Sequence, residues 1–302
     1  MFLIDNILNN TDAKIYACTR KKSNFQFEKL KFLNNNFDST RIKLVEINFQ
    51  EYNQVHKFIK DTRPDFVFNM MGPSSVSKFI ENPKEMTSIT INGFKNLTDS
   101  LIETRNFCNF YQASSSEMYG YDSPSPFNEL SEFKPNTAYA KAKHSVHLKS
   151  IKYQMEYEWN IVSGIMFNHE SEFRNSNFLI MKLIETTIEI QKNKKIKIDL
   201  PSLEISRDWS HAKDICNGIF QLTIDNFSGS YVLGSGVSTS IKDIAEYIFK
   251  KANLDCKDFI NLNNKQLRKG EPMNVVSDPE KIKKDIGWQT NLNIFEVLDR
   301  MY

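Results

Sequence analysis

The sequence predicts an α/β fold in which a mostly parallel sheet is covered by helices on both faces. Short apolar runs rich in β-branched and aromatic residues alternate with longer runs of helical periodicity along the 302 residues. Parallel strands need long crossover connections, and helices of this length provide them. Polar side chains directly follow two of the apolar runs, and ligands of such sheets bind at the carboxyl ends of the strands. We therefore expect a doubly wound, Rossmann-like sheet with its chemistry at that edge.

The elements follow one another in simple alternation. The expected strands are short, apolar and bounded by turn residues: 14–19, 42–47, 65–70, 109–114, 160–167 and 230–233. The expected helices carry apolar residues on one face: 51–61, 84–104, 137–158, 178–192, 212–223 and 241–251. We expect 1–167 and 211–238 to form the larger domain, and 168–210 with 239–302 to form a smaller C-terminal α/β lobe.

The beginning of the fold is unusual. A dinucleotide-binding sheet opens with a strand, a glycine-rich turn and a helix whose N-terminus receives the pyrophosphate. Here residues 2–10 already have the character of that helix, and 14–19 that of the second strand. None of the 10 glycines comes before Gly72. We therefore expect an N-terminally truncated sheet without the phosphate-binding turn.

Composition excludes several classes of protein. The formal net charge is +2, and lysines are spread among acidic residues, which gives little support to nucleic-acid binding. No apolar stretch is long enough for a membrane span. The four cysteines have no metal-ligand spacing, so we expect no metal, a cytoplasmic location and free thiols: Cys18, Cys108, Cys216 and Cys256.

Two segments carry the expected chemistry, YQASSSEMYG at 111–120 and NTAYAKAK at 136–143. Tyr139 and Lys143 are four residues apart on one helix face, where the ammonium group favours the phenolate form of the tyrosine. Ser115 would bind the oxygen of a reacting alcohol, so the set suits removal of a proton while hydride leaves. Glu117 could take the proton next to the new ketone and then protonate a departing hydroxyl. These four residues together predict a dehydratase.

Each of these assignments has a structural alternative. Tyr247 and Lys251 have the same spacing, and we interpret that tyrosine as a core residue and that lysine as solvated. Two features of its context separate Tyr139 from Tyr247: a serine-rich strand end about 25 residues upstream and the turn signal KPNT just before it. Glu117 could instead cap the next helix.

Four motifs together resemble the GDP-mannose 4,6-dehydratases, which are extended short-chain dehydrogenase/reductases of the epimerase/dehydratase type. They are YQASSSEMYG, the Tyr139–Lys143 pair, IMFNHES at 165–171 and SRDWSHAKD at 206–214, and the likeness runs from about Phe2 to Trp288. The resemblance implies conversion of GDP-mannose to GDP-4-keto-6-deoxymannose by internal hydride transfer through NADP. The larger domain would then bind the cofactor and the smaller lobe the nucleotide sugar. The catalytic hydroxyl, usually threonine in the family, falls on Ser115.

The resemblance also implies residues that bind the two ligands. On the cofactor side they are Arg20 and Lys21 for the 2′-phosphate, Asn48 in place of an aspartate at the adenine, Gly72, and the catalytic Tyr139 and Lys143. On the side of the GDP-sugar they are Asn168, Arg207, Arg268 and Glu271. A structural ion pair of Arg207 with Asp208 or Asp214 is the alternative for that arginine. His169 and His211 are expected to orient loops.

Several alternatives stay open at this point. The substrate could be a GDP-heptose, and the sequence does not distinguish the two sugars. The chain could be a non-catalytic nucleotide-sugar-binding homologue that has lost the dinucleotide loop, or the sequence could be an incomplete gene model whose true start lies upstream. We expect a homo-oligomer, a dimer or a tetramer, although segment 172–177 lacks the proline and one of the arginines that the family has there.

Overall fold

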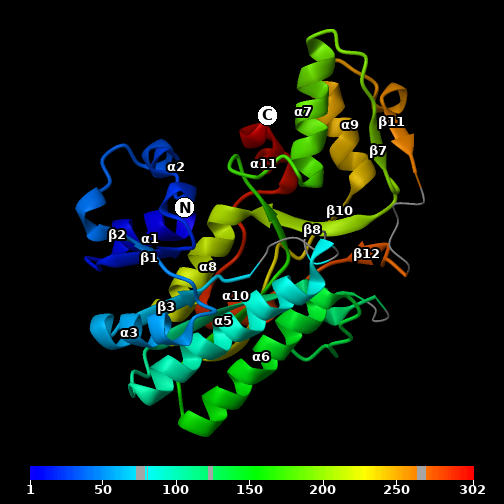
Figure 1. Cartoon of the computed structure of the whole chain (residues 1–302). Coiled ribbons are helices and arrows are strands. Elements are labelled where there is room, and N and C mark those ends of the chain that lie inside the picture. The colour runs from blue at the N-terminus through cyan, green and yellow to red at the C-terminus, as the bar shows by residue number, and fades with distance from the viewer. Residues whose placement is uncertain (73–78, 80, 122–124, 264–269) are drawn as a thin grey trace. The chain divides into compact units, whose positions relative to one another are not determined.

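The structure, a computed structural model, describes residues 1–72, 79, 81–121, 125–263 and 270–302 of the chain (Figure 1). The chain divides into two compact units, which we describe separately. The first contains 1–120, 133–165 and 216–231, and the second contains 121–132, 166–215 and 232–302. The α/β class with parallel strands is confirmed.

The first unit contains the six predicted strands and four of the six predicted helices, with ends shifted by no more than one residue. Its elements are α1 (Phe2–Asn10), β1 (Ile15–Thr19), α2 (Phe27–Leu33), β2 (Ile42–Glu46), α3 (Tyr52–Thr62), β3 (Phe66–Asn69), α5 (Pro83–Glu103), β4 (Asn109–Ser115) and α6 (Ala138–Tyr157), then β5 (Ile161–Met166), α8 (Ala212–Ile224) and β9 (Gly229–Leu233), of which the last three extend into the second unit. Helix α2 was not predicted, because two turns are too short for a clear periodic signal.

The sheet of the first unit consists of two pieces. Strand β1 pairs in parallel with β2, with Ile15 opposite Ile42. A second sheet has the order β3-β4-β5-β9, with β3 parallel to β4. In the part of the chain that the structure describes, β1 and β3 are not paired with each other (Figure 1). The strand that would join the two pieces in a doubly wound sheet is thus not among the described strands, as expected from the sequence.

The core of this unit explains why β4 and β5 are buried over almost their whole length. Helices α5 and α6 lie side by side (Figure 1), and their inner faces pack with those of α3 on strand residues such as Phe110. Trp159 closes one end of this core and donates from Nε1 to the carbonyl of Cys108 at 2.6 Å. Strands covered on both faces lose the alternation of polar and apolar residues.

The start of α6 determines where the catalytic pair lies. Thr137 caps the helix, and its Oγ1 accepts from the backbone N of Ala140 at 3.0 Å. The helix ends at Glu158, which adopts the left-handed conformation. Because the cap comes two residues before Tyr139, both Tyr139 and Lys143 lie in the first two turns.

The second unit has a smaller and more irregular architecture. It contains β6 (Asn168–Glu170), α7 (Leu179–Gln191), β7 (Ile198–Leu200), β8 (Ser206–His211), β10 (Ser238–Ser240), α9 (Ile241–Lys251), β11 (Ile260–Leu262), β12 (Asn274–Val275), α10 (Glu280–Ile286) and α11 (Ile294–Met301). Strand β8 is central, with β10 antiparallel to it and with β6 and β12 parallel to it. Helices α7, α9 and α11 share one apolar core. None of the described helices combines the length and apolar character needed to span a membrane.

Candidate active site

The carboxyl end of β4 turns directly into a short 3-10 helix, η3 (Ser116–Tyr119), that carries Glu117. Ser115, the last residue of β4, is 8 % exposed and caps this turn, because its Oγ accepts from the backbone N of Glu117 at 3.3 Å. The capping residue is therefore Ser115, and the alternative that Glu117 acts as a cap is wrong. The serine hydroxyl and the carboxylate come from the same turn, as the dehydratase hypothesis requires.

Gly120 ends this turn in a conformation that only glycine adopts easily. Its φ is 75°, and a Cβ atom at this position would run into the backbone carbonyl of Lys134. We expect Gly120→Ala to lower the free energy of unfolding by about 3 kcal/mol or more, because the clash is with backbone that cannot rotate away. Urea denaturation measures this. Gly229→Ala is the matched control, since that glycine also has a positive φ, of 91°, but an added Cβ meets nothing within 4 Å. Equal losses in the two variants would contradict the prediction.

Helix α6 presents a buried lysine to the ends of two strands. Lys143 is 6 % exposed, and its Nζ donates to the carbonyl of Ala113 on β4 at 3.0 Å and to that of Met71 after β3 at 3.4 Å. Burial lowers the pKa of Lys143 from 10.5 to about 8. The lysine thus holds a charge at neutral pH within reach of the Ser115 turn, two residues beyond Ala113.

Two more predicted residues lie beside this lysine. Gly72 follows β3 with a φ of 105°, and a Cβ atom there would lie 3.9 Å from Lys143 Nζ and 3.1 Å from Thr90 Oγ1. Tyr139 is 8 % exposed and packs edge-to-face on Phe79, with ring centroids 5.2 Å apart. The structure therefore brings Gly72, Lys143 and the end of β4 together within the first unit.

The second Tyr-x-x-x-Lys pair is built differently. On α9, the hydroxyl of Tyr247 and the Nζ of Lys251 both donate to Asp299, at 2.7 and 2.6 Å. Tyr247 packs against the core of its unit, as expected, but Lys251 forms an ion pair instead of being merely solvated. The ammonium group of Lys251 is neutralised by a carboxylate, whereas that of Lys143 donates to uncharged backbone carbonyls. Of these two lysines, Lys143 is therefore the one buried as a cation among neutral acceptors.

A buried amide pair supports the site and was not found from the sequence. Asn69 at the end of β3 donates to Gln112 of β4 at 2.7 Å, and Gln112 donates in turn to the carbonyl of Ala113 at 2.9 Å. Asn69 also accepts from the backbone N of Met71 at 3.1 Å. The two carbonyls that bind Lys143 are thereby fixed. An amide at the end of one buried strand and another in the middle of the next are the signal that would have revealed this pair.

The predicted residues for the adenosine side of a cofactor follow β1 and β2. Arg20 and Lys21 are exposed directly after β1, and Asn48 comes two residues after β2 and accepts from the backbone N of Gln50 at 3.1 Å. Parallel pairing places the ends of β1 and β2 at the same edge, with Thr19 opposite Glu46. The two basic residues and the asparagine therefore share one edge of this sheet.

A nicotinamide dinucleotide fits part of this arrangement. The basic pair suits a 2′-phosphate. Lys143 could donate to the hydroxyls of a ribose, and Gly72, which has no side chain, would let the ribose come close to the backbone.

The predicted sugar-nucleotide residues belong to the second unit. Arg207 of β8 forms an ion pair with Glu271 at 2.9 Å and donates to the carbonyls of Ser206 and Pro272 at 2.8 and 2.9 Å. Asn168 begins β6, beside β8, and its carbonyl accepts from Ser210 at 3.3 Å. Arg268 lies outside the described residues. The structure thus places Arg207 and Glu271 in contact.

The carboxylates of the SRDWSHAKD motif serve the fold. Asp208 is fully buried and accepts from the backbone N of Ser235, Gly236 and Ser277. Asp214 accepts from the backbone N and the side chain of Asn291 at 2.9 Å. Arg207 does form an ion pair, as the structural alternative expects, but with Glu271 and not with Asp208 or Asp214.

The two histidines of these motifs hold backbone segments. His211 is 1 % exposed, lies 3.2 Å from a carboxylate oxygen of Glu172 and accepts from the backbone N of Lys213. His169 Nδ1 lies 2.8 Å from the carbonyl of Phe167, and burial lowers its pKa to about 4. Both contacts agree with the expectation that these rings orient loops.

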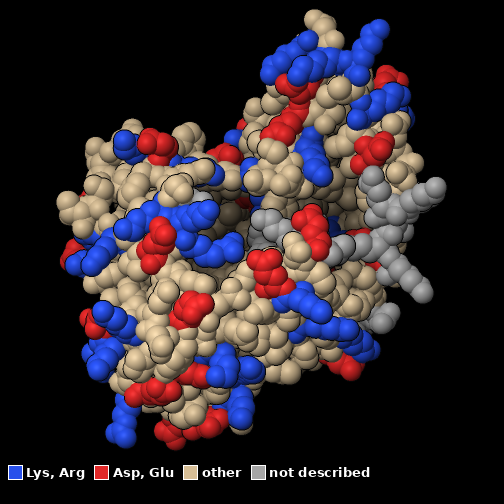
Figure 2. All heavy atoms as spheres, in the orientation of Figure 1, with Lys and Arg blue, Asp and Glu red and all other residues tan. Residues whose placement is uncertain are grey.

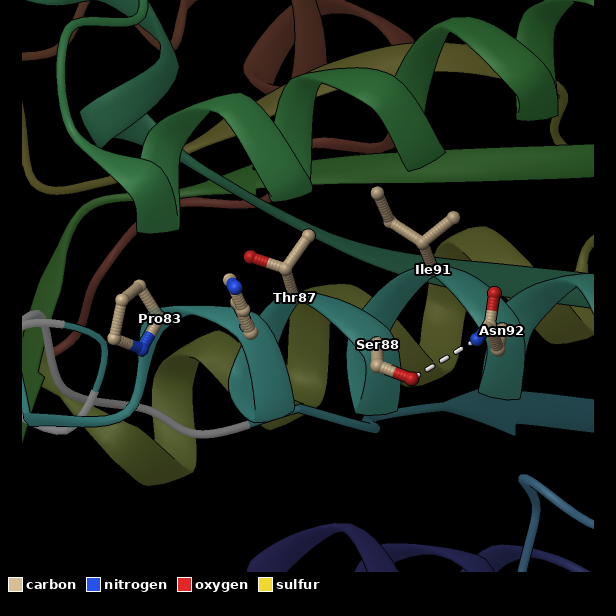
Figure 3. Close-up of a pocket in the computed structure, with 6 residues that line it drawn as sticks. Pro83, Thr87, Ser88, Ile91 and Asn92 are labelled. Atoms are coloured by element: carbon tan, nitrogen blue, oxygen red, sulfur yellow. Dashed lines mark hydrogen bonds between the residues drawn. The ribbon is translucent and has the colours of Figure 1, made fainter.

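A further hollow lies along α5. It has a volume of about 460 Å³, and Figure 3 shows that residues of the first turns of α5 line it: Pro83, Lys84, Thr87, Ser88, Ile91 and Asn92. None of them is a predicted site residue. On the face drawn in Figure 2, basic and acidic side chains interleave over much of the surface.

Comparison with known proteins identifies the family. Residues 1–301 match the family model described as GDP-mannose 4,6 dehydratase. The chain belongs to this family. GDP-mannose 4,6 dehydratase 2 of Arabidopsis thaliana is 26 % identical over 295 residues, which cover 95 % of this chain and 79 % of that protein.

Solved structures confirm the fold. The dTDP-glucose 4,6-dehydratase DesIV of Streptomyces venezuelae, solved with NAD and TYD bound, superposes with a TM-score of 0.85 at 17 % identity over 99 % of this chain and 89 % of DesIV. RMD of Pseudomonas aeruginosa, solved in complex with NADPH, superposes with a TM-score of 0.79 at 17 % identity, over 96 % of this chain and 97 % of RMD. Family membership confirms the resemblance found in the four motifs, and the roles of the individual residues stay predictions.

Proposed function

We propose that this member of the dehydratase family converts GDP-mannose to GDP-4-keto-6-deoxymannose with NADP as a recycled cofactor. The observation that carries the proposal is the buried Lys143, whose ammonium group donates to uncharged backbone carbonyls. One of them belongs to Ala113, just before the Ser115–Glu117 turn. A charged lysine in that position has a cost in stability, and an acid–base site gives a reason for it.

The residues divide the chemistry among them. Tyr139 removes the proton of the C4 hydroxyl, while the charge of Lys143 favours its phenolate, and Ser115 binds the C4 oxygen. A nicotinamide held beside these residues would supply the hydride chemistry, accepting hydride from C4 and giving it back at C6. Glu117 takes the proton from C5, next to the new ketone, and gives a proton to the hydroxyl that leaves C6 as water. As the hydride reaches C6, the proton that Tyr139 took from the C4 hydroxyl returns to C5, so the net change is loss of one water molecule.

The choice of NADP rests on Arg20 and Lys21. Two exposed cations at the end of β1 suit a 2′-phosphate, whereas an acidic residue in this place would select NAD. The RMD relative in complex with NADPH supports the same choice. Within this proposal the first unit holds the cofactor.

The second unit would hold the GDP-sugar. Arg207 with Arg268 would bind the diphosphate and Glu271 the ribose hydroxyls, with Asn168 near the phosphates. The free thiols of the buried Cys108 and Cys256 support the cytoplasmic location that we propose. Assembly as a homo-oligomer is supported by the family resemblance alone.

Titration with NADPH, followed by nicotinamide fluorescence, tests the cofactor half of the proposal. We expect binding in the micromolar range, and then appearance of a C6 methyl signal in the proton NMR spectrum when GDP-mannose is added. A GDP-heptose substrate would replace that signal with one from the longer sugar. Failure of a folded sample to turn over either sugar would contradict the proposed activity.

The two-piece sheet favours one second candidate, a non-catalytic nucleotide-sugar-binding protein. In that case the separation of the β1-β2 pair from the β3-β4-β5-β9 sheet would prevent dinucleotide binding, while the second unit would still bind the sugar nucleotide. Binding of GDP-mannose without binding of NADPH, both measured by calorimetry, would support this candidate and contradict the dehydratase.

A further inference from the structure

A second buried residue of α6 follows the catalytic pair at the same spacing. Tyr139, Lys143 and His147 are four residues apart, so they lie on one face of the helix. His147 is 1 % exposed, and its ring has hydrogen-bond partners on two strands. The proposed chemistry does not use this ring.

The two ring nitrogens of His147 contact two serines. Nδ1 lies 2.8 Å from the hydroxyl of Ser114 on β4, and Nε2 lies 3.3 Å from the hydroxyl of Ser230 on β9. The sheet order is β4-β5-β9, so the ring spans the width of the intervening strand β5. Ser114 is itself 1 % exposed, and His147 is thus the partner that its buried hydroxyl requires.

A second route connects His147 to the turn that carries Glu117. The ring of Phe133 packs edge-to-face on His147, with centroids 5.2 Å apart, and stacks on Tyr119 at 5.0 Å. Tyr119 is the last residue of η3. His147 therefore supports this turn from both sides, through Ser114 just before Ser115 and through Tyr119 just after Glu117.

We propose that His147 is a positioning residue, which ties α6 to the β4–η3 turn so that Lys143 and the Ser115–Glu117 pair keep their relative placement. This inference rests on the proposed function for its catalytic meaning, but its structural content can be tested without turnover. A helix that is free to rotate or slide would withdraw Lys143 Nζ from the Ala113 carbonyl. Misplacement of catalytic groups by about 1 Å can cost about 10²-fold in rate.

The electrostatic state of the ring agrees with this role. Burial, together with the neighbouring His144, lowers the pKa of His147 to about 4, so the ring is neutral at physiological pH. A neutral imidazole can donate to one serine and accept from the other, and it adds no second charge one turn from Lys143.

The test uses three variants and a matched control. His147→Leu removes both hydrogen bonds, Ser114→Ala removes one and leaves the ring in place, and His147→Asn offers an amide that can reach Ser114 again. The control is His144→Leu, because His144 packs on the same Phe133 ring at 5.3 Å but is only half-buried. Each variant is first checked for folding by circular dichroism.

The readout is the acetylation rate of Lys143 by trace acetic anhydride, measured by peptide mass spectrometry relative to Lys141. Lys141 is exposed on the same helix and reports general changes in reactivity. We expect His147→Leu and Ser114→Ala to raise the ratio of Lys143 to Lys141 labelling about tenfold. The reason is that loss of one buried hydrogen bond shifts the equilibrium of local opening toward the open state by about this factor. His147→Asn should return the ratio to within about threefold of wild type, and His144→Leu should leave it unchanged.

Two results would overturn the proposal. One is a labelling ratio within about twofold of wild type in a folded Ser114→Ala or His147→Leu protein. The other is an equal rise in His147→Asn and His147→Leu, which would mean that ring volume alone matters. In an active preparation, kcat should fall with KM unchanged, with rescue by His147→Asn. If the wild type shows no turnover, the proposed function fails, while the labelling result still decides the role of His147.

Discussion

Tyr139→Phe is expected to lower kcat for dehydration by about 10²–10⁴-fold, which is the usual contribution of a positioned acid–base group. Phenylalanine retains the ring, and with it the edge-to-face contact with Phe79 at 5.2 Å. Only the hydroxyl that would exchange the proton of the substrate is lost. The measurement is single-turnover formation of the keto sugar, together with the unfolding midpoint in urea to show that the variant is folded.

The chain offers a matched control for this change. Tyr247→Phe removes a hydroxyl from a pair with the same spacing, where the tyrosine donates to Asp299 at 2.7 Å on the second unit. We expect kcat to stay within about twofold of wild type, with a loss of stability on the order of 1 kcal/mol. A Tyr139→Phe enzyme as active as Tyr247→Phe would show that another group is the base.

Lys143→Met should have the second large effect, on the pH dependence of stability as well as on activity. In the folded protein, burial lowers the pKa of Lys143 from 10.5 to about 8. Between these two pH values the unfolded chain binds more protons than the folded one, so this lysine makes stability rise with pH there. Below pH 8 the lysine is charged in both states, and its full desolvation cost, about 3 kcal/mol, is present.

Methionine fills similar volume without a charge, so the variant avoids this cost. The stability of Lys143→Met relative to wild type should therefore be highest at and below pH 8. It should then fall by about 3 kcal/mol as the pH rises to 10.5. The carbonyl of Ala113 keeps a partner in the variant, because Gln112 also donates to it at 2.9 Å. Activity should be lost at every pH.

Urea denaturation between pH 7 and 10.5 measures this difference. Lys141→Met, on the exposed face of the same helix, should follow the wild-type pH profile. If the profiles of wild type and Lys143→Met run parallel, the lysine is not buried as a cation, and the electrostatic basis of the proposed site is wrong.

The sequence alone determined the alternation of strands and helices and the residues at the carboxyl end of β4. Asn109–Ser115 joins aromatic residues to a serine-rich end, and amphipathic helices such as Ile241–Lys251 have clear ends, so both are visible without any partner. The four motifs likewise sufficed to find the family, which the match over residues 1–301 confirms. Strand β8 was not predicted because its sequence, SRDWSH, is mostly polar, and β12 has only two residues.

Tertiary structure decided which polar residues act together. Spacing alone could not distinguish Tyr139–Lys143 from Tyr247–Lys251. The two pairs differ in the acceptors of the ammonium group, which are backbone carbonyls for Lys143 and the carboxylate of Asp299 for Lys251. Nor could spacing show that Arg207 meets Glu271, because that contact joins residues far apart in the sequence. A chain's local pattern fixes which side chains share a face, but the dielectric surroundings and partners of a charge are set only when distant segments pack around it.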